Sequence, residues 1–146
     1  MIPEKASYLL LIELNAQSLV QVGRKGLFLF DEGYYIYAGS ALKNAPSRIK
    51  RHFSNEKKLK WHIDFLLNNE LSELKKAFII ECNESLECTL NSIVQKSRHF
   101  AAAYKGFGSS DCKVCYSHLS RYTSDSDINI IIPELLSPFP FLAFAE

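Results

Sequence analysis

The feature that most constrains the fold of this chain is an alternating tyrosine segment that leads directly into a basic helix. Residues 33–41 read GYYIYAGSA, and this period of two predicts a strand with Tyr35 and Tyr37 on one face. Asn44 and Pro46 then have the residue types of a helix N-cap and an early helical position. A tyrosine-bearing strand that feeds a basic helix is a plausible site for gripping and cutting phosphodiesters.

The basic helix carries its charge on one face. Arg48, Arg51 and His52 stand at i, i+3 and i+4, so their side chains lie side by side. The net charge of the whole chain is only +1, but residues 43–60 hold seven basic residues against one acid. A local basic patch favours phosphate binding, while a solvated helix face explains the same run equally well. The nucleic-acid-binding candidates in and next to this run are Lys43, Lys50, Arg51, Lys57, Lys58, Lys60 and His62.

The remaining pattern predicts a small α+β domain that covers residues 1–146. An apolar run at 8–14 predicts a buried strand, and two short strands around the 23–26 turn would complete a β-meander. Further predicted elements are helices at 45–53, 57–68 and 85–96 and strands at 77–82 and 128–132. We expect the apolar C-terminal extension, 133–146, to dock on the domain or on a partner.

Composition narrows the class of protein. The chain is 47% hydrophobic, enough for a packed core, but contains no apolar run long enough for a membrane helix. The first residues lack the apolar core of a signal peptide, so a cytoplasmic protein without a membrane partner is expected. In that compartment the four cysteines predict free thiols and not disulfides.

Four residues have the chemistry that phosphodiester hydrolysis requires. A carboxylate such as Glu87 can hold one divalent metal ion, Mg²⁺ or Mn²⁺, which neutralises phosphate charge. Arg48 offers a two-pronged donor to a phosphate, and Tyr8 or Tyr37 can orient or deprotonate water. Each also has a structural interpretation: the tyrosines as half-buried strand aromatics, Arg48 and Glu87 as surface residues. Glu81 and Glu84 are the alternatives to Glu87.

These residues stand in blocks that resemble a known family. Residues 37–41 (YAGSA), followed by Arg48 and His52, resemble the second half of the GIY-YIG endonuclease signature. Its first half would be residues 6–8, where the family's glycine is Ala6. Further blocks at 60–64, 87–88 and 106–119 resemble an uncharacterised prokaryotic branch of the superfamily, found alone or fused to endonuclease III-like repair glycosylases.

The resemblance implies a fold and a set of roles. The fold would be an antiparallel sheet of about three core strands plus an extra hairpin, flanked by helices. The catalytic residues would be Tyr8, Tyr37, Arg48, His52 and Glu87, with Glu87 as the metal ligand, and His62 would be an additional active-site histidine. A late asparagine common in the superfamily has no evident counterpart. A repair glycosylase is the protein partner that the resemblance implies.

A separate motif has the spacing of a metal site. Cys112, Cys115 and His118 form C-x-x-C-x-x-H, which can wrap a tetrahedral zinc ion, but no fourth ligand is obvious. Asp111, Cys82 or Cys88 would have to come close. The family resemblance instead places Ser110, Asp111 and His118 on the substrate side. Ordinary buried thiols are the third interpretation of the cysteines.

Three functions follow as hypotheses. The first is a metal-dependent endonuclease acting on DNA, with repair or recombination substrates. The second is a non-catalytic nucleic-acid-binding module with the same fold. The third is a zinc-stabilised interaction domain centred on residues 112–118.

Overall fold

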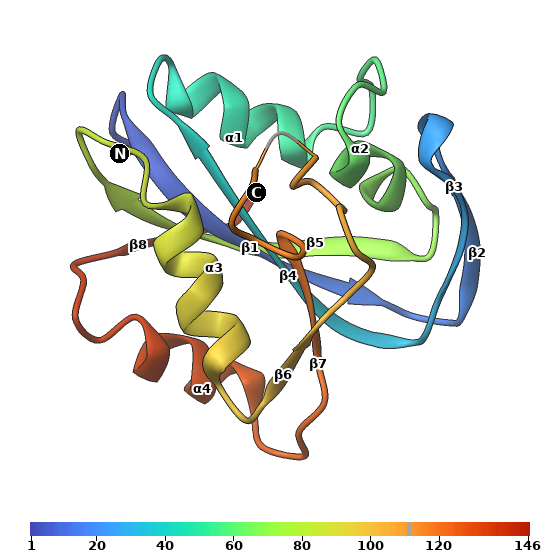
Figure 1. Cartoon of the computed structure of the whole chain (residues 1–146). Helices are drawn as coiled ribbons and strands as arrows, with labels where there is room; N and C mark the ends of the chain where they lie inside the picture. Colours follow the sequence, from blue (N-terminus) through green and yellow to red (C-terminus); the bar gives the residue numbers. More distant parts are fainter. Residues whose placement is uncertain (111) are drawn as a thin grey trace.

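The computed structural model describes residues 1–110 and 112–146, and they form three layers with a β-sheet in the middle. The sheet is antiparallel and six-stranded, in the order β6-β7-β4-β1-β5-β8. Two helices, α1 (Ala45–Phe53) and α2 (His62–Leu67), lie on one face, and α3 (Glu87–Lys96) and α4 (Ile128–Leu135) lie on the other (Figure 1). The strands are β1 (Ala6–Leu14), β4 (Gly33–Ala41), β5 (Ser72–Glu81), β6 (Phe100–Ala102), β7 (Leu119–Tyr122) and β8 (Leu142–Phe144).

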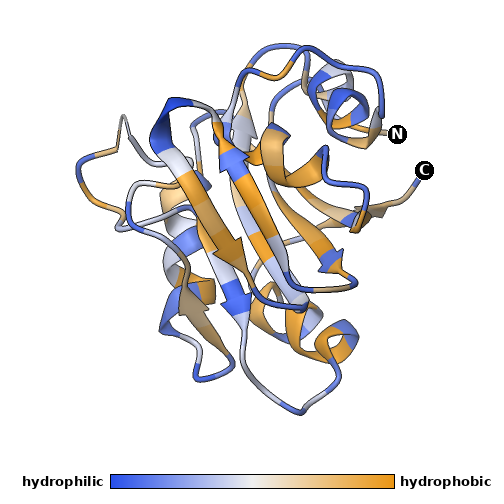
Figure 2. Ribbon diagram, turned by 90° about the vertical axis from the view of Figure 1, so that its right-hand side faces the viewer, coloured by the Kyte–Doolittle hydropathy of each residue, from blue (hydrophilic) through white to orange (hydrophobic). Residues whose placement is uncertain are grey.

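The three long strands are the sheet's centre and account for both of its buried faces. Strand β1 lies between β4 and β5 and is buried along nearly its whole length. A strand covered on both sides is mostly apolar, as β1 is (ASYLLLIEL), and the strands of the sheet show long apolar stretches, drawn in orange, in Figure 2. The side chains of Leu10 and Ile12 face α1 and α2, whereas those of Leu9 and Leu11 face α3 and α4. The expected α+β fold with a small antiparallel sheet is confirmed, and three short strands extend it.

The predicted meander is wrong in its connectivity. Strands β2 (Ser18–Val22) and β3 (Gly26–Phe30) pair only with each other, around the short helix η1 (Gly23–Lys25). The neighbour of β1 is β4, in the register Tyr8 to Gly39 and Leu10 to Tyr37. The hairpin places Val20, Val22 and Phe30 in the core beside α2 (His62–Leu67). Local alternation identified these strands, but it carries no information about which strand pairs with which.

Helix α1 (Ala45–Phe53) begins as the sequence predicts. Asn44 takes the left-handed conformation at φ 53°, and its side-chain oxygen accepts a hydrogen bond from the Ser47 N–H at 3.4 Å. Glu4 fixes the same corner, because its carboxylate accepts from the Asn44 N–H at 2.8 Å. Ile49 packs into the core, which turns the basic face of the helix towards the end of β4.

The C-terminal segment contains a second correction. Residues 128–132, predicted as a strand, belong to helix α4 (Ile128–Leu135). Asp127 caps this helix by accepting from the Asn129 N–H at 2.9 Å, and Ile128, Ile131 and Ile132 are buried at helical spacing. Cap and packing together override the β-propensity of the isoleucines. The tail docks on the domain as expected, since β8 pairs with β5.

Helix lengths also differ from the prediction. Helix α2 begins only at His62, because Asp64 accepts from the backbone N–H groups of Lys60 and Trp61 and fixes the preceding segment as a cap. Helix α3 covers Glu87–Lys96 and starts two residues later than predicted. None of the helices in the described part of the chain is long and apolar enough to cross a membrane.

Candidate active site

A cavity of about 160 Å³ gathers the five residues predicted to be catalytic. Tyr8, Tyr37, Arg48, His52 and Glu87 all line it, although they lie on two strands and two helices. It adjoins a larger cavity of about 320 Å³, and Tyr37, Trp61, Glu87 and Gly108 line both. We call the two together the cleft. Gly39, Ser40, Lys60, His62, Ser110, Cys112 and His118 complete its walls.

The sheet register explains why the two tyrosines meet. Tyr8 on β1 pairs with Gly39 on β4, and its side chain lies on the face of the sheet that α1 covers. Tyr37 is two residues before Gly39 on β4, so its side chain lies on that same face. A Cβ at position 39 would come within 2.7 Å of the Tyr8 ring. Gly39 is therefore required because the aromatic ring lies flat against its backbone.

A histidine on α1 holds the Tyr8 phenol. The Tyr8 hydroxyl and His52 Nε2 are 2.8 Å apart and both groups are buried. Burial, together with the nearby charge of Lys57, lowers the pKa of His52 to about 3. The imidazole is therefore neutral at neutral pH, and one of its nitrogens is available as an acceptor.

Burial also controls the two phenols. It raises the pKa of Tyr8 above its usual value, and the opposing positive charge of Arg48 does not offset this effect. Burial likewise raises the pKa of Tyr37, with additional contributions from Tyr8 and Glu87. Both tyrosines are thus protonated phenols in the resting site, able to orient water but poor bases.

Arg48 is fixed with its guanidinium at the cleft. Its Nη1 donates to the backbone oxygen of Ser40 at 3.0 Å, and its guanidinium carbon lies 4.5 Å from the centre of the Trp61 ring. This stacking leaves further N–H donors unused by any hydrogen bond that the described residues make. The planar fork can therefore bind a phosphate oxygen pair without first leaving its own site.

Glu87 reaches the same cleft from the first residue of α3. Two serines set the start of this helix: Ser7 Oγ accepts from the Leu86 N–H at 2.8 Å, and Ser40 Oγ lies 3.0 Å from Ser85 Oγ. Burial raises the pKa of the Glu87 carboxyl, and the charge of Arg48 opposes that shift. The alternatives, Glu81 and Glu84, are exposed outside the cleft.

The predicted basic residues divide into two groups. Arg51 is bound internally: two of its guanidinium nitrogens each donate to Asp64 at 2.9 Å, and its guanidinium carbon lies 4.3 Å from the centre of the Trp61 ring. Lys57 donates to the backbone oxygens of His52 and Arg51 at the end of α1. The exposed lysines, free to meet a ligand at the surface, are Lys43, Lys50, Lys58 and Lys60.

His62 has a defined role on the cleft wall. Its Nδ1 accepts a hydrogen bond from the Gly108 N–H at 2.9 Å, so Nε2 carries the ring proton. Gly108 is held at φ +69°, and a Cβ there would come within 2.6 Å of the Tyr37 ring. Gly108 therefore fixes the 104–110 loop against the side chains of His62 and Tyr37.

Cys112 and His118, which line the cleft, form a cluster with Cys115 and with Cys88 from α3. The sulfurs and one histidine nitrogen all lie within 4.8 Å of one another, so this cluster could hold a metal ion. Cys82 is elsewhere, with its sulfur 3.4 Å from Ser7 Oγ. Asp111, the other predicted alternative, lies outside the described residues. Of the open alternatives for the fourth ligand, the structure brings in Cys88.

Sequence reasoning missed several residues that shape the cleft. Trp61 falls within the helix predicted at 57–68 and has no role in that prediction, but two arginines stack on it. Asp64 is fully buried with its carboxylate saturated by Arg51 and two backbone N–H groups. An acidic residue that follows a basic run is a usable sequence signal for an ion pair such as that of Arg51 with Asp64. The role of Gly108 has no such signal, because it depends on contacts between residues far apart in the chain.

Residues 7–139 of this chain match the family described as domain of unknown function DUF123. The chain belongs to that family. No curated protein and no solved structure matches the chain. The match spans every element from β1 to α4, so the cleft and the cysteine cluster both lie within the family's domain.

Proposed function

We propose that this chain is a metal-dependent endonuclease that hydrolyses phosphodiester bonds in DNA. The observation that carries the proposal is the convergence of Tyr8, Tyr37, Arg48, His52 and Glu87 on one cavity. These residues are separated by up to 79 positions in the chain, and nothing in local structure requires them to meet. The resemblance to GIY-YIG endonucleases supports the same assignment.

Each residue has a distinct task in this proposal. Arg48, already oriented by Ser40 and Trp61, binds the non-bridging oxygens of the scissile phosphate. Glu87 would hold one Mg²⁺ or Mn²⁺ ion, whose charge stabilises the leaving oxygen. Carboxylate oxygen is the ligand type that these hard cations prefer.

The tyrosines position the attacking water. In this proposal the Tyr8 hydroxyl donates to the neutral His52 ring, 2.8 Å away, and the phenol oxygen accepts a hydrogen bond from water. Tyr37 lines the same cavity, next to Gly108. Because both phenols keep their protons, their contribution is orientation, and bound metal or substrate has to assist removal of the water proton.

The exposed lysines supply the electrostatic contact to DNA. Lys60 lies on the cleft wall, and Lys58 is close to it in the chain. Such contacts release counterions, so DNA binding should weaken steeply as salt increases. His62 presents its Nε2–H to the cleft and serves as an additional phosphate donor.

The experiment compares DNA cleavage by purified wild-type protein and matched variants, with Mg²⁺, Mn²⁺ or excess chelator. Plasmid, flapped and branched DNA are the substrates. We expect Arg48→Ala and Glu87→Ala each to reduce cleavage about 100-fold or more. Glu84→Ala and Arg98→Ala, at exposed positions outside the cleft, are the controls and should cut like the wild type.

A second candidate, a non-catalytic nucleic-acid-binding module, is favoured by one observation. The pKa of each cleft tyrosine is raised, so neither phenol is a ready base. This candidate predicts salt-sensitive DNA binding that Glu87→Ala leaves unchanged, and no cleavage with any metal. Binding without cleavage across all the substrates would therefore replace the endonuclease proposal with this one.

A further inference from the structure

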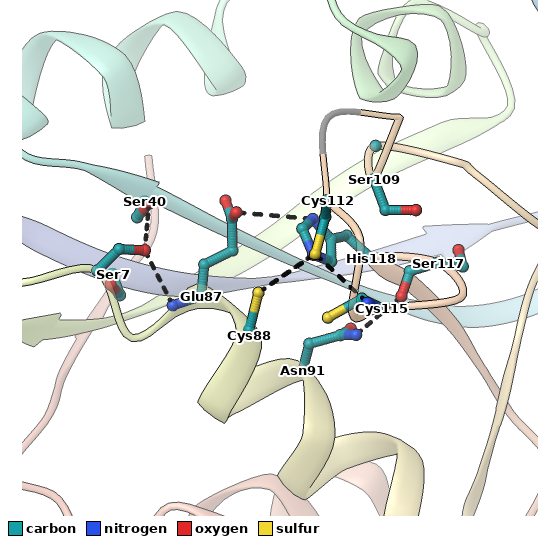
Figure 3. Close-up of polar contacts among 12 residues, drawn as sticks. Ser7, Ser40, Glu87, Cys88, Asn91, Ser109, Cys112, Cys115, Ser117 and His118 are labelled. Atoms are coloured by element: carbon teal, nitrogen blue, oxygen red, sulfur yellow. Dashed lines mark hydrogen bonds and ion pairs between the residues drawn. The ribbon is translucent and has the colours of Figure 1, made fainter.

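Four metal-ligand side chains meet at the junction of α3 and the segment that leads into β7. Cys88 is the second residue of α3, Cys112 and Cys115 lie on the loop, and His118 immediately precedes β7. The Cys88 sulfur lies 3.6 Å from that of Cys112 and 3.9 Å from His118 Nε2 (Figure 3). The three cysteines are free thiols, half-buried, and His118 is 2% exposed.

We propose that Cys88, Cys112, Cys115 and His118 bind a single zinc ion as a structural site. Around a tetrahedral zinc with Zn–S bonds of about 2.3 Å, two thiolate sulfurs stand roughly 3.8 Å apart. The 3.6 Å between the Cys88 and Cys112 sulfurs is close to this spacing, and all four ligand atoms lie within 4.8 Å of one another. They leave room for one ion at the centre. Three thiolates and one imidazole form a ligand set that selects zinc over the hard cations.

The ligand count assigns the site a structural role. Four protein ligands close the coordination sphere of zinc, whereas a catalytic zinc keeps one position open for water. This site is therefore separate from the Mg²⁺ or Mn²⁺ position proposed at Glu87, which offers oxygen. Zinc binding would tie the start of α3 to the loop that also carries Gly108, across 24 to 30 residues of chain.

The orientation of His118 agrees with metal ligation. Its Nε2 faces the sulfurs, while its Nδ1 lies 3.7 Å from a carboxylate oxygen of Glu87. Nδ1 is buried and has no hydrogen-bond partner among the described residues. Histidines that bind zinc commonly point their second nitrogen at a carboxylate. Glu87 thus borders both sites, and the zinc ligands fix the helix end from which it projects.

The primary experiment is metal analysis of the full chain, purified under reducing conditions without chelator. We expect about one zinc ion per chain in the wild type. Cys88→Ser should lower the zinc affinity at least about 100-fold, because even loss of an outer-sphere partner typically costs 10- to 100-fold. Cys82→Ser is the matched control, since Cys82 is also a half-buried free thiol but lies outside the cluster.

A second measurement covers the case in which Cys88→Ser does not fold. Wild-type protein stripped of metal is titrated with Co²⁺, and we expect the intense visible bands of tetrahedral cobalt together with thiolate-to-cobalt charge transfer. Folded wild-type protein that contains no zinc and takes up no cobalt in this form would overturn the proposal, as would full zinc content in Cys88→Ser.

The readouts are independent of nuclease activity. A protein that binds zinc and cuts no DNA supports the zinc site and removes the endonuclease proposal. A protein that cuts DNA and holds no zinc supports the endonuclease proposal and removes the zinc site. The two proposals therefore stand or fall separately.

Discussion

The side of the cleft that carries the tyrosines and Arg48 and the cysteine cluster next to it are built in opposite ways. Tyr8, Tyr37 and Arg48 are held by regular elements, and their positions follow from strand register and a capped helix. The cysteine cluster is mounted mostly on a loop, and only Cys88 lies on a helix. Hydrogen bonds and packing within the protein hold the side chains of the first region in place. The second region consists of four side chains whose potential ligand atoms lie close together. The comparison teaches that one fold can preorganise one set of side chains by packing and carry a neighbouring set mostly on a loop.

The largest expected effect tests whether the cleft side is held independently. Asp64→Ala removes the buried carboxylate that binds Arg51 and two backbone N–H groups. We expect the free energy of unfolding to fall by about 3–5 kcal/mol, as for other broken buried ion pairs, measured by urea denaturation. Zinc content in the folded protein should not change. The control is Glu56→Ala, at an exposed carboxylate in the same segment, which should cost under about 0.5 kcal/mol.

If folded Asp64→Ala protein loses its zinc as well as its stability, the two regions depend on each other, and the conclusion that the cleft side is held independently is wrong.

A smaller effect tests the joint between the two regions. Gly108→Ala places a Cβ within 2.6 Å of the Tyr37 ring and keeps a positive φ, so strain and overpacking both act. Gly106→Ala is the matched control, because Gly106 has a similar φ of +78° and a Cβ there meets only the flexible end of the Lys25 side chain, at 2.9 Å. We expect Gly108→Ala to be more destabilising than Gly106→Ala by about 1–3 kcal/mol in thermal unfolding.

If the two Gly→Ala substitutions reduce the stability equally, the Tyr37 side chain moves aside without cost. The cleft wall would then be less rigid than its packing indicates.

The smallest expected effect is a pH dependence from His52. The pKa of His52 is lowered to about 3 in the folded protein and is about 6.5 in the unfolded chain. Between these values the unfolded state binds the extra proton, so stability falls as pH decreases from about 6.5. The slope is at most about 1.4 kcal/mol per pH unit. Urea denaturation of the wild type and His52→Gln from pH 7 to pH 5 gives the difference.

His52→Gln should show the shallower pH dependence, because glutamine does not titrate. Identical slopes for the two proteins would contradict a buried neutral His52 and, with it, the proposed Tyr8–His52 hydrogen bond.

Local patterns in the sequence predicted the elements that carry the site. The alternating pattern of residues 33–41 located β4. The residue types at Asn44 and Pro46 located the start of α1, and apolar residues at helical spacing located α3. These signals work because each arises within a few residues. The isoleucines of α4 show the limit, since their β-propensity favours a strand until a cap and a buried face decide otherwise.

What the sequence determined by itself was the chemistry available: tyrosines on strands, arginine and histidine on one helix face, and C-x-x-C-x-x-H on a loop. What only the tertiary structure decided was which of these side chains meet. The pairing of β1 with β4 set Tyr8 against Gly39 and left the predicted meander unformed. The packing of α3 on the sheet brought in Cys88, one of several sequence alternatives. Register and long-range packing are properties of the whole chain, and they brought Glu87 to the tyrosines and Cys88 to the loop.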